Sequence, residues 1–446
     1  MESLQRELGP EVLSPPDEPS RYAVDGQEPL ALAQPGTVEE LAAILRLATE
    51  HSVPVAPYGS GSFVHLGAPA AAAGMALCLA RLNTIVAHEP ADLTVTVQAG
   101  VTLGDLQRCL GEHDQCLPLD PACSDEATIG GIVAAGASGP SRFRYGTSAD
   151  MLLGMRAVAA TGEPMKAGGR VVKNVAGYDL TRLFVGSLGT LGVLTELTFK
   201  VWPCLPERAM VVGWCESCEQ AQQVAAALVA SQLEPVFVEL LNARSLGRAD
   251  HWPLSTDDGG SAVVIAGFWG TDAETSYQLT EAKALFLETG ARPEGVRGED
   301  ERAGRLWLRT LVPRIGGGPA GLVTMKLSVL SSDVGKVISK AERLAGDFGW
   351  RCAAQAHAGN GIVYVIVEAP SPIDEPPERV AGLCEELRAE TQRLGGWAII
   401  ERGPVAVKKL AGVWGNTGAQ WELMASIKRA FDPAGILNPG RLTDGR

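Results

Sequence analysis

The chain carries the sequence K-N-V-A-G-Y-D-L at residues 173–180 and the sequence G-S-L-G-T-L-G-V-L-T at residues 186–195. Glycine and other small residues recur in both segments, so the surface of another molecule can lie directly against their backbone. Taken alone, either segment is equally well explained by tight packing inside a small glycine-rich domain. The segments that precede them decide between these two interpretations.

Two earlier segments have the same character. Residues 128–139 read T-I-G-G-I-V-A-A-G-A-S-G, and residues 53–62 read V-P-V-A-P-Y-G-S-G-S. In the segment 53–62 a strand ends in a turn with two glycines and two serines, and the successive backbone N–H groups of such a turn can hold a phosphate without a basic side chain. Four small-residue segments between residues 53 and 195 therefore predict one extended ligand.

These four segments, in this order, resemble the flavin-binding domain of the vanillyl-alcohol oxidase superfamily, the type named after p-cresol methylhydroxylase (PCMH). The tail adds F-D-P-A-G-I-L-N-P-G-R at residues 431–441. The resemblance is strong over 21–203 and 425–441 and weak over 207–400. The K-N-V-A-G-Y-D-L segment, with A-A-G-A-S-G-P upstream at 134–140, looks most like the FAD-binding E chains of bacterial glycolate oxidases. That family implies two partners, a larger flavoprotein subunit and an iron–sulfur subunit.

The resemblance implies a set of FAD-binding positions. Tyr58 to Ser62 would hold the pyrophosphate, the segment 128–139 would line the middle of FAD and its isoalloxazine, the segment 189–193 would approach the adenine end, and Asn438 would lie near the ring. The full set is Pro57, Tyr58, Gly59, Ser60, Gly61, Ser62, Thr128, Gly130, Gly131, Ser138, Gly139, Gly189, Gly192, Val193 and Asn438. Many relatives tether the flavin to a histidine in the first loop. Here that loop has none before His65, so non-covalent FAD is expected.

The substrate half departs from the family pattern. Hydroxy-acid dehydrogenases of the superfamily carry a metal motif H-x-G-D-G-N-x-H and a later G-E-H-G. This chain has His357 at the first position but Asn360 and Tyr364 in place of the aspartate and the second histidine, and Arg402 follows Glu401. A divalent ion prefers two or three imidazole or carboxylate ligands, so no metal is expected. His357 is interpreted as a structural residue.

Oxidation of a hydroxy acid needs a base for the hydroxyl proton while hydride moves to the flavin N5. The sequence identifies no such base. Arg309 and Lys326 match positions at which relatives contact a substrate carboxylate, a task suited to charge pairing. The alternative is that both are surface or ion-paired residues.

The predicted fold class is α+β. We expect a flexible arm over residues 1–20, a two-subdomain FAD-binding domain over 21–203, a ferredoxin-like α+β cap or substrate domain over 207–400, and a return segment over 401–446. Within the FAD domain, Thr37 and Glu40 form a capping-box pattern that predicts a helix over 38–51. The cap domain is predicted to alternate strands with amphipathic helices on one antiparallel sheet. Its expected helices cover 218–231, 272–289, 333–347 and 376–394, and the tail is expected to hold a helix over 420–431.

Composition excludes several classes of protein. The 446 residues include 38 Lys and Arg against 52 Asp and Glu, a net charge of −14 without any basic stripe, so a nucleic-acid partner is not expected. No apolar run reaches the ~18 residues of a membrane span, and the polar, acidic start does not resemble a secretory signal. We expect a cytoplasmic protein, with any membrane association peripheral and through partners. The nine scattered cysteines are typical of reduced thiols.

Three functions remain open. The first is an FAD-dependent oxidoreductase that oxidises a small 2-hydroxy acid, such as glycolate or D-lactate, and passes electrons to a partner protein. The second is an FAD-holding assembly or electron-relay component whose own substrate site has degenerated. The third is an independent oxidase or dehydrogenase of a bulkier alcohol or sugar-like substrate.

Overall fold

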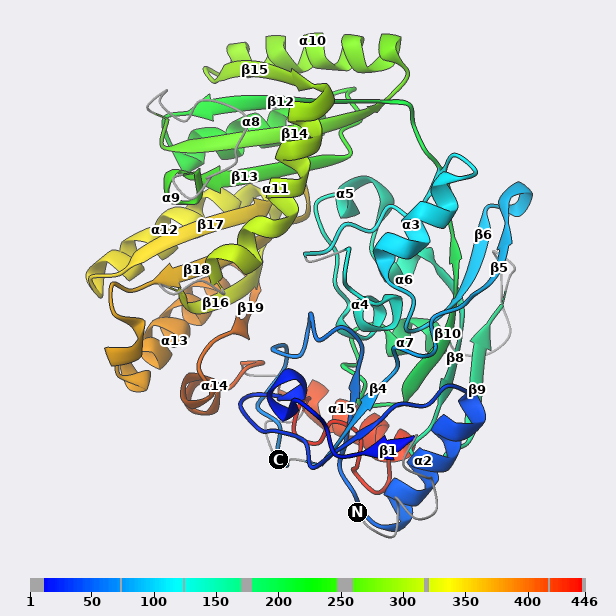
Figure 1. The fold of residues 1–446 in the computed structure, drawn as a ribbon. Coiled ribbons are helices and arrows are strands. Elements are labelled where there is room, and N and C mark those ends of the chain that lie inside the picture. The colour runs from blue at the N-terminus through cyan, green and yellow to red at the C-terminus, as the bar shows by residue number, and fades with distance from the viewer. Residues whose placement is uncertain are drawn as a thin grey trace.

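The computed structural model describes residues 12–72, 74–122, 125–169, 179–246, 260–316, 321–415 and 418–442. It divides into two lobes (Figure 1). The first lobe holds residues 12–204 together with the tail from residue 418, and the second lobe holds residues 207–413. The second lobe stands on one flank of the first, and the red C-terminal helix lies among the blue N-terminal elements of the first lobe.

The first lobe is built on two main sheets and a short two-stranded one. The four-stranded sheet has the order β1-β2-β4-β3, the five-stranded sheet has the order β5-β6-β10-β8-β9, and β11 pairs with β7. The strands are β1 Leu13–Ser14, β2 Ala31–Ala33, β3 Val55–Tyr58, β4 Met75–Cys78, β5 Ile85–Glu89, β6 Thr94–Gln98, β7 Gln115–Cys116, β8 Leu152–Val158, β9 Pro164–Gly168, β10 Val193–Lys200 and β11 Trp202–Pro203.

The helices of the first lobe are mostly short. They are η1 Pro19–Tyr22, α2 Val38–Glu50, η2 Pro90–Asp92, α3 Leu103–Gly111, α4 Ile129–Ala135, α5 Arg142–Tyr145, α6 Ser148–Met151, α7 Leu180–Phe184 and α15 Gln420–Phe431. The predicted helix over 38–51 is confirmed as α2. The side chain of Thr37 accepts a hydrogen bond from the Glu40 N–H, and the apolar positions Leu41 and Ile44 are buried because they share one face.

Part of the predicted flexible arm is ordered. β1 pairs antiparallel with β2, with Leu13 opposite Ala33, and the Leu13 side chain is only 1% exposed. Residues 1–11 lie outside the described residues. The prediction of an arm up to residue 20 was therefore wrong for residues 13–14, because one leucine among polar and proline residues is enough to dock a short edge strand.

The second lobe contains one eight-stranded sheet with the order β15-β12-β14-β13-β17-β18-β16-β19, in which every printed pairing is antiparallel. The strands are β12 Glu207–Cys215, β13 Phe237–Asn242, β14 Ala262–Gly270, β15 Arg292–Arg297, β16 Gly321–Ser328, β17 Arg351–His357, β18 Ile362–Glu368 and β19 Trp397–Arg402. The helices are α8 Cys218–Ala230, α9 Ala243–Leu246, α10 Asp272–Glu288, α11 Gly298–Gly316, η3 Ser331–Asp333, α12 Val334–Asp347, η4 Ala358–Asn360, η5 Pro372–Asp374, α13 Pro377–Arg393 and α14 Val405–Ala411.

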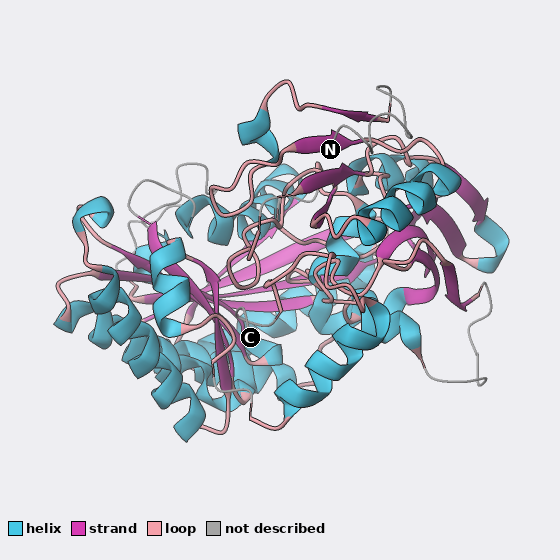
Figure 2. Cartoon of the chain, turned by 90° about the horizontal axis from the view of Figure 1, so that it is seen from below, coloured by secondary structure: helices cyan, strands magenta, loops and turns pink. Residues whose placement is uncertain are grey.

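The two faces of this sheet are covered differently. Helices α8, α10, α12 and α13 bury one face in a large apolar core, and Figure 2 shows helices stacked along the outside of this lobe. The other face carries a smaller cluster in which Trp307, Leu308 and Leu311 of α11 pack on the strands. Alternate residues of a strand point to opposite faces, so the partly covered face is free to present polar side chains toward the first lobe.

Several elements of the second lobe were not predicted, among them β15, α11, β17 and β19. Helix α11 begins with the charged run Gly298 to Arg302, and β17 reads R-C-A-A-Q-A-H, which is rich in alanine and has no β-branched residue. Strands β15, β17 and β19 are held by hydrogen bonds to their neighbours in the sheet, and α11 is held by packing on the sheet.

The return of the tail begins later than the predicted residue 401. Strand β19 pairs with β16, and Val407 of α14 belongs to the core of the second lobe. The buried guanidinium of Arg388 donates to the carbonyl groups of Ala411, Gly412 and Val413. The tail therefore stays with the second lobe through Val413.

The returning tail then docks on the first lobe. The Val55 N–H donates to the Ile436 carbonyl at 2.8 Å, and the Asn438 N–H donates to the Val55 carbonyl at 2.8 Å. The ring of Phe431 packs edge-on against Phe184. The motif around Asn438 is thereby brought beside the glycine-rich turn that follows β3.

Candidate functional site

The glycine-rich segments surround one hollow in the first lobe. Most of the predicted FAD positions line it. They are Pro57, Tyr58, Gly59, Ser60, Gly61, Ser62, Thr128, Gly130, Gly131, Gly189, Gly192, Val193 and Asn438. The end of β3, the start of α4, the start of β10 and the tail thus meet at a single place, although they lie far apart in the sequence.

Glycine allows the turn after β3 to lie against the start of α4. A Cβ atom on Gly59 would stand 2.1 Å from the Thr128 Oγ1, a distance that real Cβ atoms do not reach. Gly61 has a φ of +83°, and a Cβ atom there would stand 2.1 Å from the Tyr58 hydroxyl. Both positions therefore exclude any side chain, the second one for backbone conformation as well.

The turn also leaves backbone donors available. Within the described residues, the N–H groups of Ser60, Gly61 and Ser62 donate to no backbone carbonyl group. Among the described residues that line this hollow, only Arg441 has a charged side chain. Backbone N–H groups in a turn can bind phosphate oxygens, so the first hollow fits the pyrophosphate of a dinucleotide such as FAD.

Asn438 closes the hollow from the side of the tail. Its backbone is left-handed, with a φ of +40°, and its side-chain amide donates to the Leu188 carbonyl at 2.7 Å. Gly189, with a φ of +66°, lies so near that an added Cβ would be 3.2 Å from the Pro57 ring. The tail thereby holds the turn 186–192 against β3.

A second hollow of about 890 Å³ lies between the two lobes. It shares Ser62, Phe63, Leu66 and Ala135 with the first hollow, so the two are adjacent. Ser138 and Gly139, predicted with the FAD group, line this second hollow instead of the first. Arg309 and Lys326 also line it, so the structure brings the two predicted carboxylate contacts together.

A row of polar side chains lies on the partly covered face of the large sheet, and three of its members, His357, Tyr364 and Lys326, line the second hollow. Glu239 of β13 stands directly opposite His357 of β17, and Tyr364 of β18 stands directly opposite Lys326 of β16. The His357 and Tyr364 rings contact edge to face, with centroids 5.6 Å apart. Four neighbouring strands therefore place a carboxylate, an imidazole, a phenol and an ammonium group in sequence.

The cations of the second hollow keep donors available. Arg309 of α11 is 3.5 Å from the Asp125 carboxylate, its side chain is 12% exposed, and its buried Nε has no hydrogen-bond partner among the described residues. The Lys326 ammonium lies 4.0 Å from the Glu401 carboxylate and 5.7 Å from the centre of the Tyr364 ring. The pKa of Lys326 is raised, because the effects of Tyr364 and Glu401 outweigh the lowering by burial. This site can therefore bind an anion.

Burial also shifts the pKa values of two acidic groups in this row. It raises the pKa of the Tyr364 phenol and of the Glu401 carboxyl, although Lys326 opposes it in both cases. Tyr364 is thus a neutral hydroxyl at physiological pH, able to donate a hydrogen bond to a bound oxygen.

His357 is held by a carboxylate that the sequence analysis did not identify. The His357 Nδ1 lies 2.6 Å from one oxygen of Glu239, and the Gln355 amide donates to the other oxygen at 2.7 Å. The His357 Nε2 is buried and has no hydrogen-bond partner within the described chain. The one available signal was a glutamate in the middle of the otherwise apolar strand F-V-E-L-L-N.

The metal motif of the hydroxy-acid dehydrogenases is incomplete in this chain. Among the described residues, no group of three or more His, Cys, Asp or Glu side chains is arranged to hold a metal ion. Tyr364 and Lys326 occupy the place between His357 and Glu401 in the row across the sheet.

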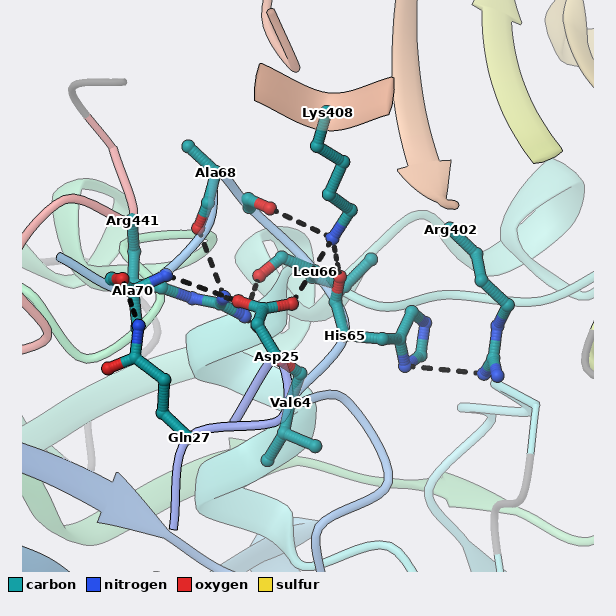
Figure 3. A network of polar contacts seen from close by, with 11 residues as sticks. Asp25, Gln27, Val64, His65, Leu66, Ala68, Ala70, Arg402, Lys408 and Arg441 are labelled. Atoms are coloured by element: carbon teal, nitrogen blue, oxygen red, sulfur yellow. Dashed lines mark hydrogen bonds and ion pairs between the residues drawn. The ribbon is translucent and has the colours of Figure 1, made fainter. Parts of the chain in front are cut away.

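A buried ionic network fixes the loop between the two hollows (Figure 3). The Lys408 ammonium of α14 donates to the carbonyl groups of His65 at 2.5 Å and Gly67 at 3.1 Å, and lies 3.8 Å from Asp25. Arg441 of the tail pairs with Asp25 and also donates to the carbonyl groups of Val64 and Leu66. Both lobes and the tail thus hold the loop 64–68.

The network controls the charge state of two of its members. Burial, Arg402 and Lys408 lower the pKa of His65 to about 3, and the Nδ1 of this ring lies 3.3 Å from the Arg402 guanidinium. Burial lowers the pKa of Lys408 to about 8. His65 is therefore neutral at every physiological pH.

None of the helices in the described part of the chain combines the length and apolarity needed to cross a membrane.

Two known protein families match the chain. The FAD binding domain family matches residues 29–168, and the family of the C-terminal domain of FAD linked oxidases matches residues 205–442. The chain belongs to the FAD-linked oxidases, and FAD is its cofactor. It is an FAD-linked oxidoreductase, as the sequence analysis predicted.

Individual relatives share most of the chain. Glycolate oxidase subunit GlcD of Bacillus subtilis (strain 168) is 27% identical over 425 residues, which cover 93% of this chain and 89% of that protein. D-2-hydroxyglutarate dehydrogenase of Xanthomonas citri pv. viticola is 30% identical over 429 residues, with 93% and 89% covered. D-lactate dehydrogenase of Anaerostipes hadrus is 27% identical over 426 residues, with 93% and 89% covered. The predicted likeness to the E chains of glycolate oxidases in particular stays a prediction.

Solved structures confirm the predicted fold class. p-Cresol methylhydroxylase with substrate bound superposes with a TM-score of 0.78 at 20% identity and covers 99% of this chain and 95% of that one. 4-Ethylphenol oxidase from Gulosibacter chungangensis gives a TM-score of 0.76 at 18% identity, with 99% and 95% covered. The first lobe therefore has the PCMH-type FAD-binding fold, followed by the C-terminal α+β domain of the family.

Proposed function

We propose that this protein oxidises a small 2-hydroxy acid, such as glycolate or D-lactate, with FAD in the first hollow and the acid in the second. The observation that carries the proposal is the cationic second hollow, where Arg309 and Lys326 face a space that adjoins the glycine-lined hollow. The names of relatives include a glycolate oxidase subunit, D-lactate dehydrogenases and a D-2-hydroxyglutarate dehydrogenase. All three names refer to 2-hydroxy acids.

The first hollow would hold FAD through the positions that line it. Ser60, Gly61 and Ser62 would donate backbone hydrogen bonds to the pyrophosphate, while Gly130 and Gly131 would let the cofactor approach the start of α4. Bound FAD supplies the acceptor for the hydride that leaves the substrate. We propose a non-covalent cofactor, because no histidine or cysteine is among the described residues lining the first hollow and the His65 ring lies beside Arg402.

The second hollow would hold the carboxylate of the acid. Guanidinium and ammonium groups form charge-assisted hydrogen bonds with carboxylates, which are stronger than neutral ones. Arg309 would supply the directional contact, and Lys326 would supply a second positive charge. The neutral Tyr364 hydroxyl would donate to the same anion or to its hydroxyl oxygen.

A second function, that of an FAD-holding component for electron relay or assembly, is favoured by one observation. Tyr364 and Arg402 stand where hydroxy-acid dehydrogenases of the superfamily carry histidines, so a metal-assisted reaction has lost its ligands. In that case the chain would act beside a larger flavoprotein subunit and an iron–sulfur subunit, and its second hollow would bind no reacting substrate.

Anaerobic titration of the purified yellow protein separates the two functions. Glycolate or D-lactate should bleach the flavin absorbance of the isolated chain, and the variant Arg309→Met should keep the flavin but lose the bleaching. The matched control is Arg302→Met, an exposed arginine on the same helix. Bleaching that occurs only after the partner proteins are added would reject the proposed reaction and support electron relay.

A further inference from the structure

We propose that His357 is the base that takes the hydroxyl proton of the substrate and that Glu239 is the positioning residue that orients it. This inference rests on the proposed function and gives the second hollow the group that the sequence analysis did not find. Its basis is the geometry of the buried pair and the place of the second imidazole nitrogen.

The backbone register sets the pair in place. Glu239 and His357 are directly opposed on neighbouring strands, and the Glu239 Oε1 and His357 Nδ1 lie 2.6 Å apart. Glu239 is 0% exposed and His357 is 3% exposed. Gln355, two residues before His357 on the same face, donates to the second Glu239 oxygen and to the Leu308 carbonyl at 3.1 Å. The Glu239 carboxylate that holds the imidazole is therefore fixed by neighbouring strands and, through Gln355, by α11.

The contact with Glu239 determines which nitrogen carries the hydrogen. A carboxylate only accepts hydrogen bonds, so the neutral imidazole must carry its hydrogen on Nδ1. The Nε2 then has a lone pair, and it is the nitrogen that has no partner among the described residues although it is buried. His357 lines the second hollow with Arg309 and Lys326. A lone pair in a cationic anion-binding site is the arrangement that a general base requires.

The other titratable groups around this ring are less suited to the task. Tyr364 on β18 and Lys326 on β16 have raised pKa values and hold their protons, and the Glu401 carboxylate on β19 is paired with the Lys326 ammonium at 4.0 Å. Arg309 on α11 and Arg142 on α5 are permanent cations. His65 is neutral, but it belongs to the loop network and its Nδ1 lies beside the Arg402 guanidinium.

The proposed step balances as follows. The substrate O–H bond breaks, and the proton goes to the His357 Nε2. The C–H bond on the same carbon breaks, and the hydrogen leaves with its electron pair to oxidised FAD. The C–O bond becomes a carbonyl, so the acid is oxidised to a 2-oxo acid and FAD is reduced by two electrons. Glu239 stabilises the imidazolium until its proton is lost to solvent.

Rapid anaerobic reduction of the holoprotein by D-lactate or glycolate tests the assignment. His357→Gln keeps an amide that can donate to Glu239, and it should slow flavin reduction by about 10²- to 10⁴-fold, the usual contribution of a general base. Its FAD content and its affinity for the non-reacting anion oxalate, measured by calorimetry, should stay within about threefold of the wild type. The matched control His88→Gln changes a histidine of β5 that pairs with Gln115 outside both hollows, and it should reduce at the wild-type rate.

Two further readouts separate catalysis from structural support. Glu239→Gln should move the imidazole hydrogen from Nδ1 to Nε2, because the new amide can donate to Nδ1, and should slow reduction while oxalate still binds. Nitrogen NMR of the six histidines should show the Nδ1–H tautomer for His357 in the wild type.

The outcomes are distinguishable. A wild-type protein that no 2-hydroxy acid reduces would overturn the proposed function, and the base assignment with it. Reduction of the wild type together with an undiminished rate in His357→Gln would overturn only the base. An Nε2–H tautomer in the wild type would also overturn it, whatever the rates.

Discussion

The two adjoining hollows are lined by different kinds of residue. The first is lined by glycine backbone and by small and apolar side chains, with Arg441 as the one charged residue among those described there, whereas the lining of the second includes arginine, lysine, histidine and glutamate side chains. In the proposed function, the first would recognise FAD through shape and backbone N–H groups, and the second would recognise a carboxylate through charge. The four residues that they share bring these two kinds of recognition into contact.

This difference means that the two sites respond differently to mutation. A backbone cradle depends on the absence of side chains, so almost any substitution there fills space that FAD or a neighbouring segment needs. A charged site depends on the charged ends of a few side chains, so a single substitution changes ligand binding without affecting the fold. The contrast leads to measurable differences between variants of the two hollows.

Apart from His357→Gln, the largest effect is expected from Arg309→Met in the second hollow. Loss of one buried charged contact to a carboxylate should lower the efficiency of flavin reduction by D-lactate or glycolate by about 100-fold or more, while the FAD content stays equal to that of the wild type. Anaerobic stopped-flow reduction and the flavin-to-protein absorbance ratio measure both quantities. An equal loss in Arg302→Met would show that the effect is not local to the hollow.

The next effect is expected from Gly61→Ala in the first hollow. The positive φ and the 2.1 Å approach to the Tyr58 hydroxyl should lower the affinity for FAD by about 10- to 100-fold, since a strained backbone conformation costs on the order of 1–3 kcal/mol. Fluorescence titration of the apoprotein with FAD measures it. Gly111→Ala, where no described atom lies within 4 Å of an added Cβ, is the control and should bind FAD normally. Normal FAD binding by Gly61→Ala would contradict the proposed cradle.

A smaller effect is expected from His65→Gln in the loop between the hollows. The unfolded chain binds a proton on this ring below its ordinary pKa of 6.5, and the folded protein binds it only near pH 3, so acidification between these values favours unfolding. At pH 5 this costs the wild type about 2 kcal/mol of unfolding free energy, and His65→Gln should remove that loss. Urea unfolding at pH 5 and pH 8 measures it, with the exposed His51→Gln as control. Equal acid sensitivity in His65→Gln and the wild type would contradict the burial of a neutral ring.

The smallest effect is expected from helix caps in the two lobes. Thr37→Ala removes the cap of α2 in the first lobe, and Thr271→Ala removes the capping box of α10 in the second lobe. Each should lower the unfolding free energy by about 1 kcal/mol. Added FAD should offset the Thr37→Ala loss in thermal unfolding monitored in the first lobe, whereas a probe in the second lobe should report the Thr271→Ala loss at any FAD concentration. An equal response of both variants to FAD would show that the lobes unfold together.

Much of the first lobe, and most of the residues that line its hollow, could be predicted from the amino-acid sequence. The capping pattern of Thr37 and Glu40, the glycines after β3 and the asparagine of the tail are local signals, because a turn or a cap needs particular residue types at fixed spacing. The second lobe was harder to predict. Helix α11 was not predicted although its acidic first turn is typical of a helix start. Strand β17 is rich in alanine, whose strand preference is weak, so the sheet around it decides its structure.

The amino-acid sequence by itself determined the cofactor class, the FAD-linked family and the helices with strong apolar periodicity, since these depend on residue types within short segments. Only the tertiary structure decided that Ser138 and Gly139 face the second hollow, that the tail leaves the second lobe after Val413, and that Glu239 meets His357. The last pair lies on strands 118 residues apart, and no local spacing relates them. Strand order and register bring them together, and these are set by the packing of the whole sheet.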